Sequence, residues 1–187
     1  MKQYNYVVII AIYTNGGGFL YHLLKPNCIA KSLHDIELEL LKKKGIKGVI
    51  FDLDNTIIAW DSPSMQPEII SWIGSLLEQD YRICLLSNNM THRVKNIAEL
   101  LGVPYVPKAY KPAKTGFRRA IAQLKLKPSE IAVIGDQLFT DVLGGNRLGL
   151  FTIWVAPLST NEFIGTKITR KLEKLTVRLL KFKGIIK

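Results

Sequence analysis

The chain has 187 residues, of which 48% are hydrophobic and 22% are charged, and its formal net charge is +11. This length and composition predict one globular domain and exclude an intrinsically disordered chain. The positive charge predicts an anionic partner, which is a phosphate ester, a nucleic acid or an acidic membrane surface. Cys28 and Cys84 have no CxxC partner, which argues against a disulfide scaffold or a zinc cluster and favours a reducing, cytoplasmic compartment.

The first residues do not fit the pattern of the rest. Residues 7–13 form an apolar run of seven, far short of the ~20 residues that a membrane-spanning helix needs. A signal peptide is an alternative because Lys2 precedes this run, but residues 15–18 offer no convincing cleavage pattern. We interpret residues 1–22 as an extension outside the core fold, residues 23–160 as the main domain, and residues 161–187 as a basic amphipathic helix.

Helical and extended patterns alternate along the main domain. The predicted helices cover residues 33–44, 67–77, 91–101, 113–126 and 139–148, and the predicted strands cover residues 46–52, 82–87, 105–106, 131–135 and 151–155. Strands and helices that alternate with short connections predict a doubly wound, three-layer α/β/α sheet of parallel strands, which is a Rossmann-like arrangement.

The stretch from residue 48 to residue 56 organises this prediction. An apolar run without charge ends there in Asp52 and Asp54, which are followed by turn-forming residues. Such a run is typical of a strand that is buried on both faces. The two carboxylates should therefore lie at the carboxyl end of the strand, where open α/β sheets bind their ligands.

Other strands should deliver polar side chains to the same edge of the sheet. These are Ser87 and Asn88 after the second predicted strand, Lys111 in the loop after the third, and Asp136 and Asp141 after the fourth. Clustered carboxylates repel one another without a cation, so the set predicts a hard divalent metal such as Mg²⁺, which prefers oxygen ligands. Lys111 and the hydroxyl of Ser87 are suited to bind a phosphate anion. The pattern predicts a phosphoryl-transfer site.

These motifs resemble those of the haloacid dehalogenase-like (HAD) phosphatase superfamily. Residues 52–56 (DLDNT) resemble its first motif, residues 87–89 its second, Lys111-Pro112 its third, and residues 135–141 (GDQLFTD) its fourth. Residues 135–149 make the chain similar to the YqeG-type phosphatases of subclass IIIA, and this likeness spans about residues 23–184.

The resemblance implies a HAD-like fold and a role for each motif residue. Phosphomonoester hydrolysis would depend on Mg²⁺ and pass through an aspartyl-phosphate. Asp52 would be the nucleophile, and Asp54 would be the general acid and then the general base. The metal would be held by Asp52, the backbone carbonyl of Asp54, Asp136 and Asp141, and the phosphate would be bound by Ser87, Asn88 and Lys111.

The spacing of the motifs leaves no room for a large cap domain. Asp54 and Ser87 are 33 positions apart, and Ser87 and Lys111 are 24 apart, whereas a self-standing domain needs at least ~50 residues. An open site suits a phosphate that is presented from outside by a lipid, a protein or a nucleic acid.

The end of the chain is strongly basic. Residues 164–187 contain eight basic residues and one acidic residue, Glu173. Apolar residues recur there at helical spacing, at Ile164, Ile168, Leu172, Leu175 and Leu179. Such a helix suits the surface of an anionic membrane; a terminal helix that packs on the domain with a solvated basic face is an equally open interpretation. With Phe182 as its one aromatic residue and no stacking pattern, the segment does not favour nucleic acid.

YqeG-type proteins are in turn similar to mitochondrial phosphatidylglycerophosphate phosphatases. Together with the open site and the basic tail, this likeness implies dephosphorylation of phosphatidylglycerophosphate, an anionic phospholipid, at the inner face of a membrane during phosphatidylglycerol synthesis. Two alternatives remain, a soluble phosphatase of nucleotides or sugar phosphates and a binding module that keeps the fold without catalysis. The complete motif set argues against the binding module.

Overall fold

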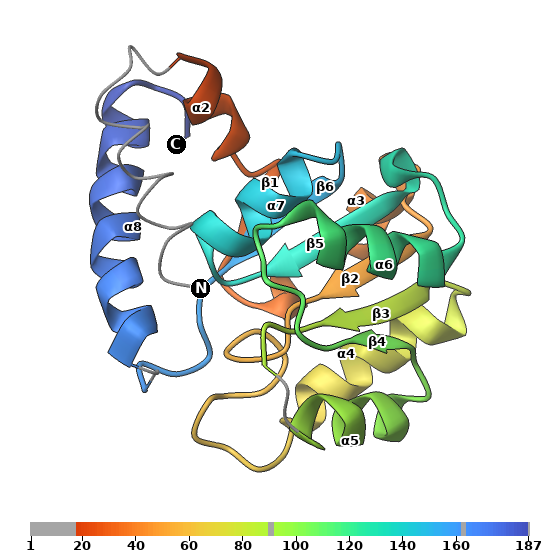
Figure 1. Cartoon of the computed structure of the whole chain (residues 1–187). Helices are drawn as coiled ribbons and strands as arrows, with labels where there is room; N and C mark the ends of the chain where they lie inside the picture. Colours follow the sequence, from red (N-terminus) through yellow and green to blue (C-terminus); the bar gives the residue numbers. More distant parts are fainter. Residues whose placement is uncertain (1–17, 90–91, 162–163, 187) are drawn as a thin grey trace.

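The computed structural model describes residues 18–89, 92–161 and 164–186. Its centre is one sheet in the order β1-β6-β5-β2-β3-β4, and every pairing of neighbouring strands is parallel (Figure 1). The strands are β1 (Cys28–Ala30), β2 (Gly48–Phe51), β3 (Arg82–Leu86), β4 (Tyr105–Val106), β5 (Ile131–Gly135) and β6 (Phe151–Val155). The predicted parallel α/β sheet is confirmed.

Five of these strands match the predicted ones to within two residues at either end. The two central strands, β2 and β5, are buried along their whole length, as apolar runs without alternation predict. The edge strand β1 was not predicted. It has three residues, follows a proline by two positions and pairs with β6 alone, so it is too short to carry a periodic pattern.

Helices cover both faces of the sheet, and the last helix lies beyond the carboxyl ends of the strands (Figure 1). They are α2 (Gly18–Leu23), η1 (Leu33–Asp35), α3 (Leu38–Lys43), α4 (Pro67–Glu78), α5 (His92–Leu101), α6 (Lys114–Leu124), η2 (Pro128–Glu130), η3 (Leu138–Val142), α7 (Leu143–Asn146) and α8 (Ile164–Phe182). Along β2, Val49 and Phe51 belong to the core cluster under α4 and α5, whereas Ile50 belongs to the cluster under α6. This alternation is the period of two of a strand, and it places one helical layer on each face of the sheet.

Two predicted helices differ in detail from the observed ones. The helix expected over residues 33–44 is split into η1 and α3, because Asp35 accepts a hydrogen bond from the backbone N–H of Ser32 at 2.9 Å and closes a single turn, after which Ile36 is extended. The helix expected over residues 139–148 begins as the π-helical turn η3 and continues as the short α7. Such turns are frequent at functional sites.

The structure adds no domain between the sequence motifs. Residues 55–86 contain a loop, α4 and β3, and the described part of residues 88–110 contains α5 and β4. The predicted absence of a large cap is therefore confirmed for the described residues.

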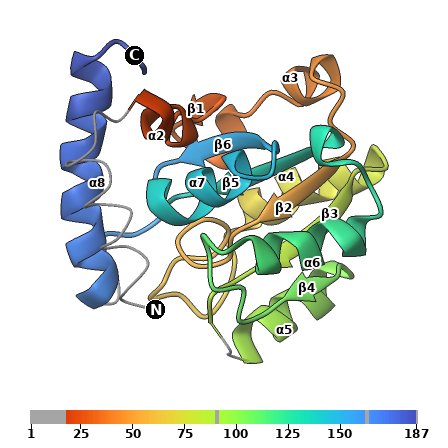
Figure 2. The same cartoon turned by 45° about the horizontal axis from the view of Figure 1, so that its top comes forward.

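The two ends of the described chain pack together. A third apolar cluster joins Leu24, which follows α2, to Leu180 of α8 and to Leu138 and Phe139 of η3, and both views show α8 beside α2 (Figures 1 and 2). Most of the predicted N-terminal extension, residues 1–17, lies outside the described residues, but its last part forms α2 and packs on the fold through Tyr21. Among the described helices, none is both long and apolar enough to cross a membrane.

Candidate active site

The site lies where the order of the strands reverses. From β2 the chain continues to β3 and β4 on one side of the sheet and then crosses to β5 and β6 on the other. The crevice between the carboxyl ends of β2 and β5 is therefore the topological switch point, where doubly wound sheets bind ligands. Asp52 follows β2 directly and Asp136 follows β5 directly.

A tight turn after β2 determines the positions of the first two aspartates. The carbonyl oxygen of Leu53 accepts hydrogen bonds from the backbone N–H groups of Ile57 and Ile58 at 3.1 and 3.2 Å. Asn55 has a φ of 62°, a left-handed conformation that asparagine tolerates better than most residues. The turn lets Asp54 approach the site from the loop while Asp52 stays at the end of the strand.

Three carboxylates meet at this point. Asp52, Asp136 and Asp141 each offer an oxygen within 4.8 Å of the others, and their residues are 6%, 0% and 1% exposed. Thr56 Oγ1 lies 3.3 Å from Asp52 Oδ2 and 3.3 Å from Asp136 Oδ1, so it joins the two strand ends. A Cβ atom at Gly135 would overlap the carboxyl group of Asp141. The absence of a side chain at Gly135 therefore leaves the space that the Asp141 carboxylate occupies.

Lys111 reaches the cluster from the loop after β4. Its Nζ atom donates to Asp141 Oδ1 at 2.7 Å and also contacts Asp52 Oδ1. Burial raises the pKa of Asp141 to about 6, although Lys111 opposes this effect. Burial also raises the pKa of Asp136 well above its ordinary value, against the attraction of the Arg170 guanidinium. Burial alone would lower the pKa of Lys111, but Asp141 and Asp52 together raise it, so the ammonium group is charged.

Asp54 lies apart from the three clustered carboxylates. Its Oδ2 atom accepts a hydrogen bond from Asn89 Nδ2 at 2.7 Å, and its Oδ1 atom is 3.8 Å from Arg93 Nη1. Oδ1 is buried and has no hydrogen-bond partner among the described residues. One carboxyl oxygen of Asp54 is therefore not used in a hydrogen bond within the described structure.

The second motif holds the backbone of Lys111 by hydrogen bonds. Both polar atoms of the Asn88 side chain bind the backbone of Lys111, with Oδ1 accepting from its N–H at 2.6 Å and Nδ2 donating to its carbonyl at 3.4 Å. The side chain of Asn88 thus positions the lysine, and its predicted phosphate contact stays a prediction. Ser87 is 1% exposed, and its Oγ atom accepts a hydrogen bond from the backbone N–H of Asn89 at 3.1 Å.

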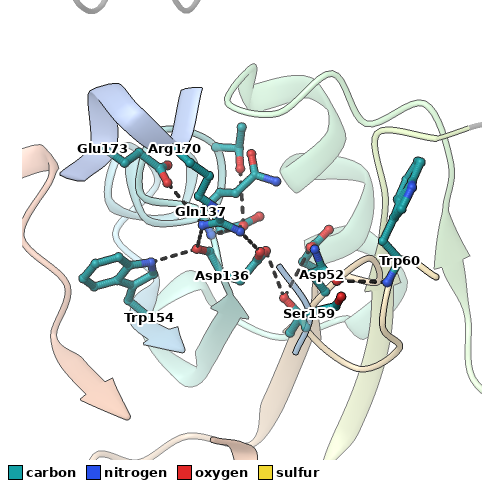
Figure 3. A network of polar contacts seen from close by, with 12 residues as sticks. Asp52, Trp60, Asp136, Gln137, Trp154, Ser159, Arg170 and Glu173 are labelled. Atoms are coloured by element: carbon teal, nitrogen blue, oxygen red, sulfur yellow. Dashed lines mark hydrogen bonds and ion pairs between the residues drawn. The ribbon is translucent and has the colours of Figure 1, made fainter. Parts of the chain in front are cut away.

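The C-terminal helix supplies two site residues that sequence analysis missed. Arg170 pairs with Asp136 and, at 3.2 Å, with Glu173, and Figure 3 shows its guanidinium between the two carboxylates. Burial raises the pKa of Glu173 to about 7, against the nearby guanidinium. The sequence held one signal, because Glu173 is the only acidic residue among eight basic ones in residues 164–187.

The charges and donor types together fit a hard divalent cation. The described site contains five carboxyl groups and three cationic side chains; they are Asp52, Asp54, Asp136, Asp141 and Glu173, and Arg93, Lys111 and Arg170. A divalent cation among the clustered oxygens would favour their ionised forms, which burial disfavours. Oxygen donors of this kind are those that Mg²⁺ prefers.

Comparisons with known proteins identify a family of phosphatases. The sequence model of a family described as mitochondrial PGP phosphatase matches residues 20–157. The chain is 42% identical over 161 residues to the probable phosphatase YqeG of Bacillus subtilis, which covers 86% of this chain and 94% of that protein. It is 31% identical over 166 residues to phosphatidylglycerophosphate phosphatase 1 of Arabidopsis thaliana, which covers 83% of this chain and 47% of that protein.

A solved structure supports the fold. The cobalt-bound deoxy-D-mannose-octulosonate 8-phosphate phosphatase of Haemophilus influenzae superposes with a TM-score of 0.50 at 17% identity, over 76% of this chain and 92% of that one. At this identity the likeness concerns the fold alone. With the family match and the acidic site at the switch point, these findings show that the chain belongs to the mitochondrial PGP phosphatase family and is a phosphatase of the haloacid dehalogenase type.

Proposed function

We propose that this chain hydrolyses the phosphate monoester of phosphatidylglycerophosphate at an anionic membrane surface, with Mg²⁺ in the acidic cluster and Asp52 as the nucleophile. The observation that carries the proposal is the meeting of Asp52, Asp136 and Asp141 with Lys111 at the switch point. The substrate is supported by the family match and by a relative that is named as a phosphatidylglycerophosphate phosphatase.

In the proposed chemistry each of these side chains has a defined role. An Asp52 oxygen attacks phosphorus in line, the bond from phosphorus to the lipid oxygen breaks, and Asp54 gives a proton to the departing alkoxide. Asp54 then takes a proton from the water that attacks the aspartyl-phosphate, which releases inorganic phosphate and restores Asp52. Lys111 and Ser87 hold the phosphoryl oxygens during both steps.

The metal complements these groups. It would be held by Asp52, Asp136, Asp141 and the backbone carbonyl of Asp54, and it would supply positive charge that lets an anionic nucleophile approach an anionic phosphate. The chain's own contribution is to keep the donors buried and fixed. Asp136 and Asp141 are 0% and 1% exposed.

The outer face of α8 supports a lipid substrate. We use this name for the exposed residues Lys171, Leu175, Arg178 and Phe182, of which Leu175 is 49% and Phe182 is 90% exposed. Leu175 and Phe182 are seven residues apart and so lie on the same side of the helix. Exposed apolar side chains between cations suit a bilayer surface, where each basic residue adds about 1 kcal/mol.

The position of α8 places this helix near the site, with its outer face on the side opposite to Arg170 and Glu173. Figure 1 shows α8 on the side of the molecule toward which the arrows of β3 and β5 point, and the acidic cluster lies at the ends of the strands on that side. A membrane that contacts the outer face would therefore lie near the carboxyl ends of the strands, with α8 between it and the acidic cluster.

A substrate comparison tests the proposal. Purified protein is assayed for phosphate release from phosphatidylglycerophosphate in mixed micelles and from a soluble phosphate ester, with Mg²⁺ and with excess chelator. We expect Mg²⁺-dependent release from the lipid and a loss of at least about 1,000-fold in Asp52→Asn, because the nucleophile is removed. Brisk turnover of the soluble ester without lipid turnover would discard the lipid substrate. Full turnover in chelator would discard the metal.

A second experiment tests the outer face of α8. The double variant Leu175→Asp/Phe182→Asp is compared with Leu100→Asp, which alters a 67% exposed leucine on α5. We expect the ratio of turnover on anionic vesicles to turnover of the soluble ester to fall at least about tenfold in the double variant, while Leu100→Asp keeps the wild-type ratio. Equal ratios in all three proteins would remove this face from the proposal.

A further inference from the structure

We propose that Arg170 is a positioning residue for the metal ligand Asp136, so that the C-terminal helix α8 is a working part of the metal site. The inference rests on the proposed metal-dependent function and extends it to a residue outside the four sequence motifs. It concerns how well the cluster binds its cation. It does not concern which substrate is cleaved.

Arg170 holds Asp136 by two different groups. Its Nη2 atom pairs with Asp136 Oδ2, and its Nη1 atom donates to the backbone carbonyl of the same residue. Trp154 Nε1 donates to that carbonyl at 2.9 Å from the other side, as Figure 3 shows. A planar guanidinium that bonds both the carboxylate and the backbone of one residue restricts the rotation of that carboxylate.

These contacts give the two carboxyl oxygens of Asp136 different partners. Oδ2 is used by Arg170, whereas Oδ1 lies 3.3 Å from Thr56 Oγ1, which is also 3.3 Å from Asp52 Oδ2. Oδ1 is therefore the oxygen on the Asp52 side, where the three carboxylates meet. With Asp136 completely buried, the guanidinium determines which oxygen is available to a cation.

Arg170 is itself fixed by the inner side of α8. Glu173 lies one turn further along the helix and accepts from Arg170 Nη1 at 3.2 Å through Oε2. Its other oxygen, Oε1, accepts the backbone N–H of Phe139 at 3.0 Å. Phe139 belongs to η3, the turn that carries Asp141. The pair Arg170 and Glu173 thus connects α8 to both aspartates of the fourth motif.

A purely structural ion pair is the simpler interpretation of the same contacts. It predicts that loss of Arg170 lowers stability and leaves metal affinity unchanged. A competing guanidinium, which the cation would have to displace, predicts tighter metal binding after its removal. Positioning predicts weaker binding, because loss of a partner behind a metal ligand typically costs about 10- to 100-fold in affinity.

Titration calorimetry with Mg²⁺ on the full-length protein distinguishes these three interpretations. We expect Arg170→Met to raise the Kd for Mg²⁺ by about 10- to 100-fold, and Arg170→Lys to fall between this variant and wild type, because lysine keeps the charge and loses the fork. The matched control is Arg82→Met. Arg82 also donates to backbone carbonyls, those of Leu124 and Lys125, but it does so at the opposite end of the sheet.

A second pair of variants keeps the test decisive if Arg170→Met does not fold. Arg170→Met/Glu173→Gln removes one charge of each sign and is compared with Glu173→Gln alone. Weaker Mg²⁺ binding in the double variant supports positioning. Positioning is overturned if the Kd for Mg²⁺ is unchanged or smaller in Arg170→Met than in wild type, or in the double variant than in Glu173→Gln. If wild-type protein itself binds no Mg²⁺ and turns over in chelator, the proposed function fails instead, so the two failures are distinguishable.

Discussion

Replacing Lys111 with methionine tests whether one ammonium group stabilises the carboxylate cluster. The side chain of Lys111 is 3% exposed, and its Nζ atom contacts Asp141 Oδ1 at 2.7 Å as well as Asp52. Methionine keeps the length of the side chain and removes its charge, which leaves two buried carboxylates without this counter-ion. Breaking a buried ion pair by removing one partner costs about 3–5 kcal/mol, so we expect this loss in the free energy of unfolding when metal is chelated.

The loss should be smaller when Mg²⁺ is present. Without the ammonium group, oxygens of Asp52 and Asp141 no longer have a competing donor, so Mg²⁺ should bind Lys111→Met more tightly than wild type. A tenfold tighter Kd corresponds to about 1.4 kcal/mol, and saturating metal would return that amount of stability to the variant. Lys111→Met should nevertheless lose catalytic activity, because in the proposed mechanism the ammonium group of Lys111 binds the phosphoryl oxygens.

Urea unfolding in chelator and in saturating Mg²⁺ measures both effects. The matched control is Lys47→Met, whose partner Glu130 Oε1 is also 2.7 Å from the lysine nitrogen, although the Lys47 side chain is 65% exposed. Exposed pairs contribute less than about 1 kcal/mol, so this variant should change little in either condition. The double variant Lys111→Met/Asp141→Asn should recover stability in chelator, because one of the unpaired carboxylates is gone. A loss under about 1 kcal/mol for Lys111→Met, or an equal loss in both conditions, would refute this account of the buried charges.

Three further predictions concern the surroundings of the cluster. Gly135→Ala should weaken Mg²⁺ binding in calorimetry, because the new Cβ would overlap the carboxyl group of Asp141; wild-type affinity would contradict the geometry. Gly144→Ala should lower Tm, since its Cβ would overlap the ring of Phe117 and overpacking costs about 1–3 kcal/mol; an unchanged Tm would count against this packing. Burial raises the pKa of Glu173 to about 7, so Glu173 stays protonated to a higher pH in the folded state than in the unfolded state. Stability should therefore fall by up to about 3 kcal/mol as pH rises from about 4.5 to 7, and Glu173→Gln should unfold in urea with a flatter pH dependence; identical pH profiles would contradict this.

The four motifs were predictable because strand ends and turn residues are local features. Phe51-Asp52 and Gly135-Asp136 each join an apolar run to a carboxylate. In a parallel sheet such junctions all lie at one edge. The convergence of these side chains therefore needed only the element order and the direction of the strands. In the structure, oxygens of Asp52, Asp136 and Asp141 lie within 4.8 Å of one another, and Lys111 Nζ contacts Asp52 and Asp141.

The apolar stripe predicted for the C-terminal helix was less accurate. Leu172 packs on the third cluster as a partly buried residue, but Leu175 is 49% exposed. The face that α8 buries instead includes Glu173, Thr176 and Leu180. Spacing alone selected the most apolar side of the helix, whereas the structure buries a side with an acid and a hydroxyl. Both groups are hydrogen-bonded there, Glu173 to the backbone N–H of Phe139 and Thr176 to the carbonyl of Leu172 in its own helix.

The sequence by itself determined the parallel α/β fold, the edge of the sheet that carries the chemistry and the identity of the motif residues. These follow from apolar periodicity, turn chemistry and charge, which act over a few neighbouring residues. The role of Arg170 was decided only by tertiary structure, since it lies 34 positions from Asp136. Arg170 is one of several basic residues in the tail, and nothing in its local sequence marks it as a site residue. Its pairing with Asp136 depends on the packing of α8 against η3. Short-range patterns could thus locate the site, but only the packed chain could place the C-terminal helix in it.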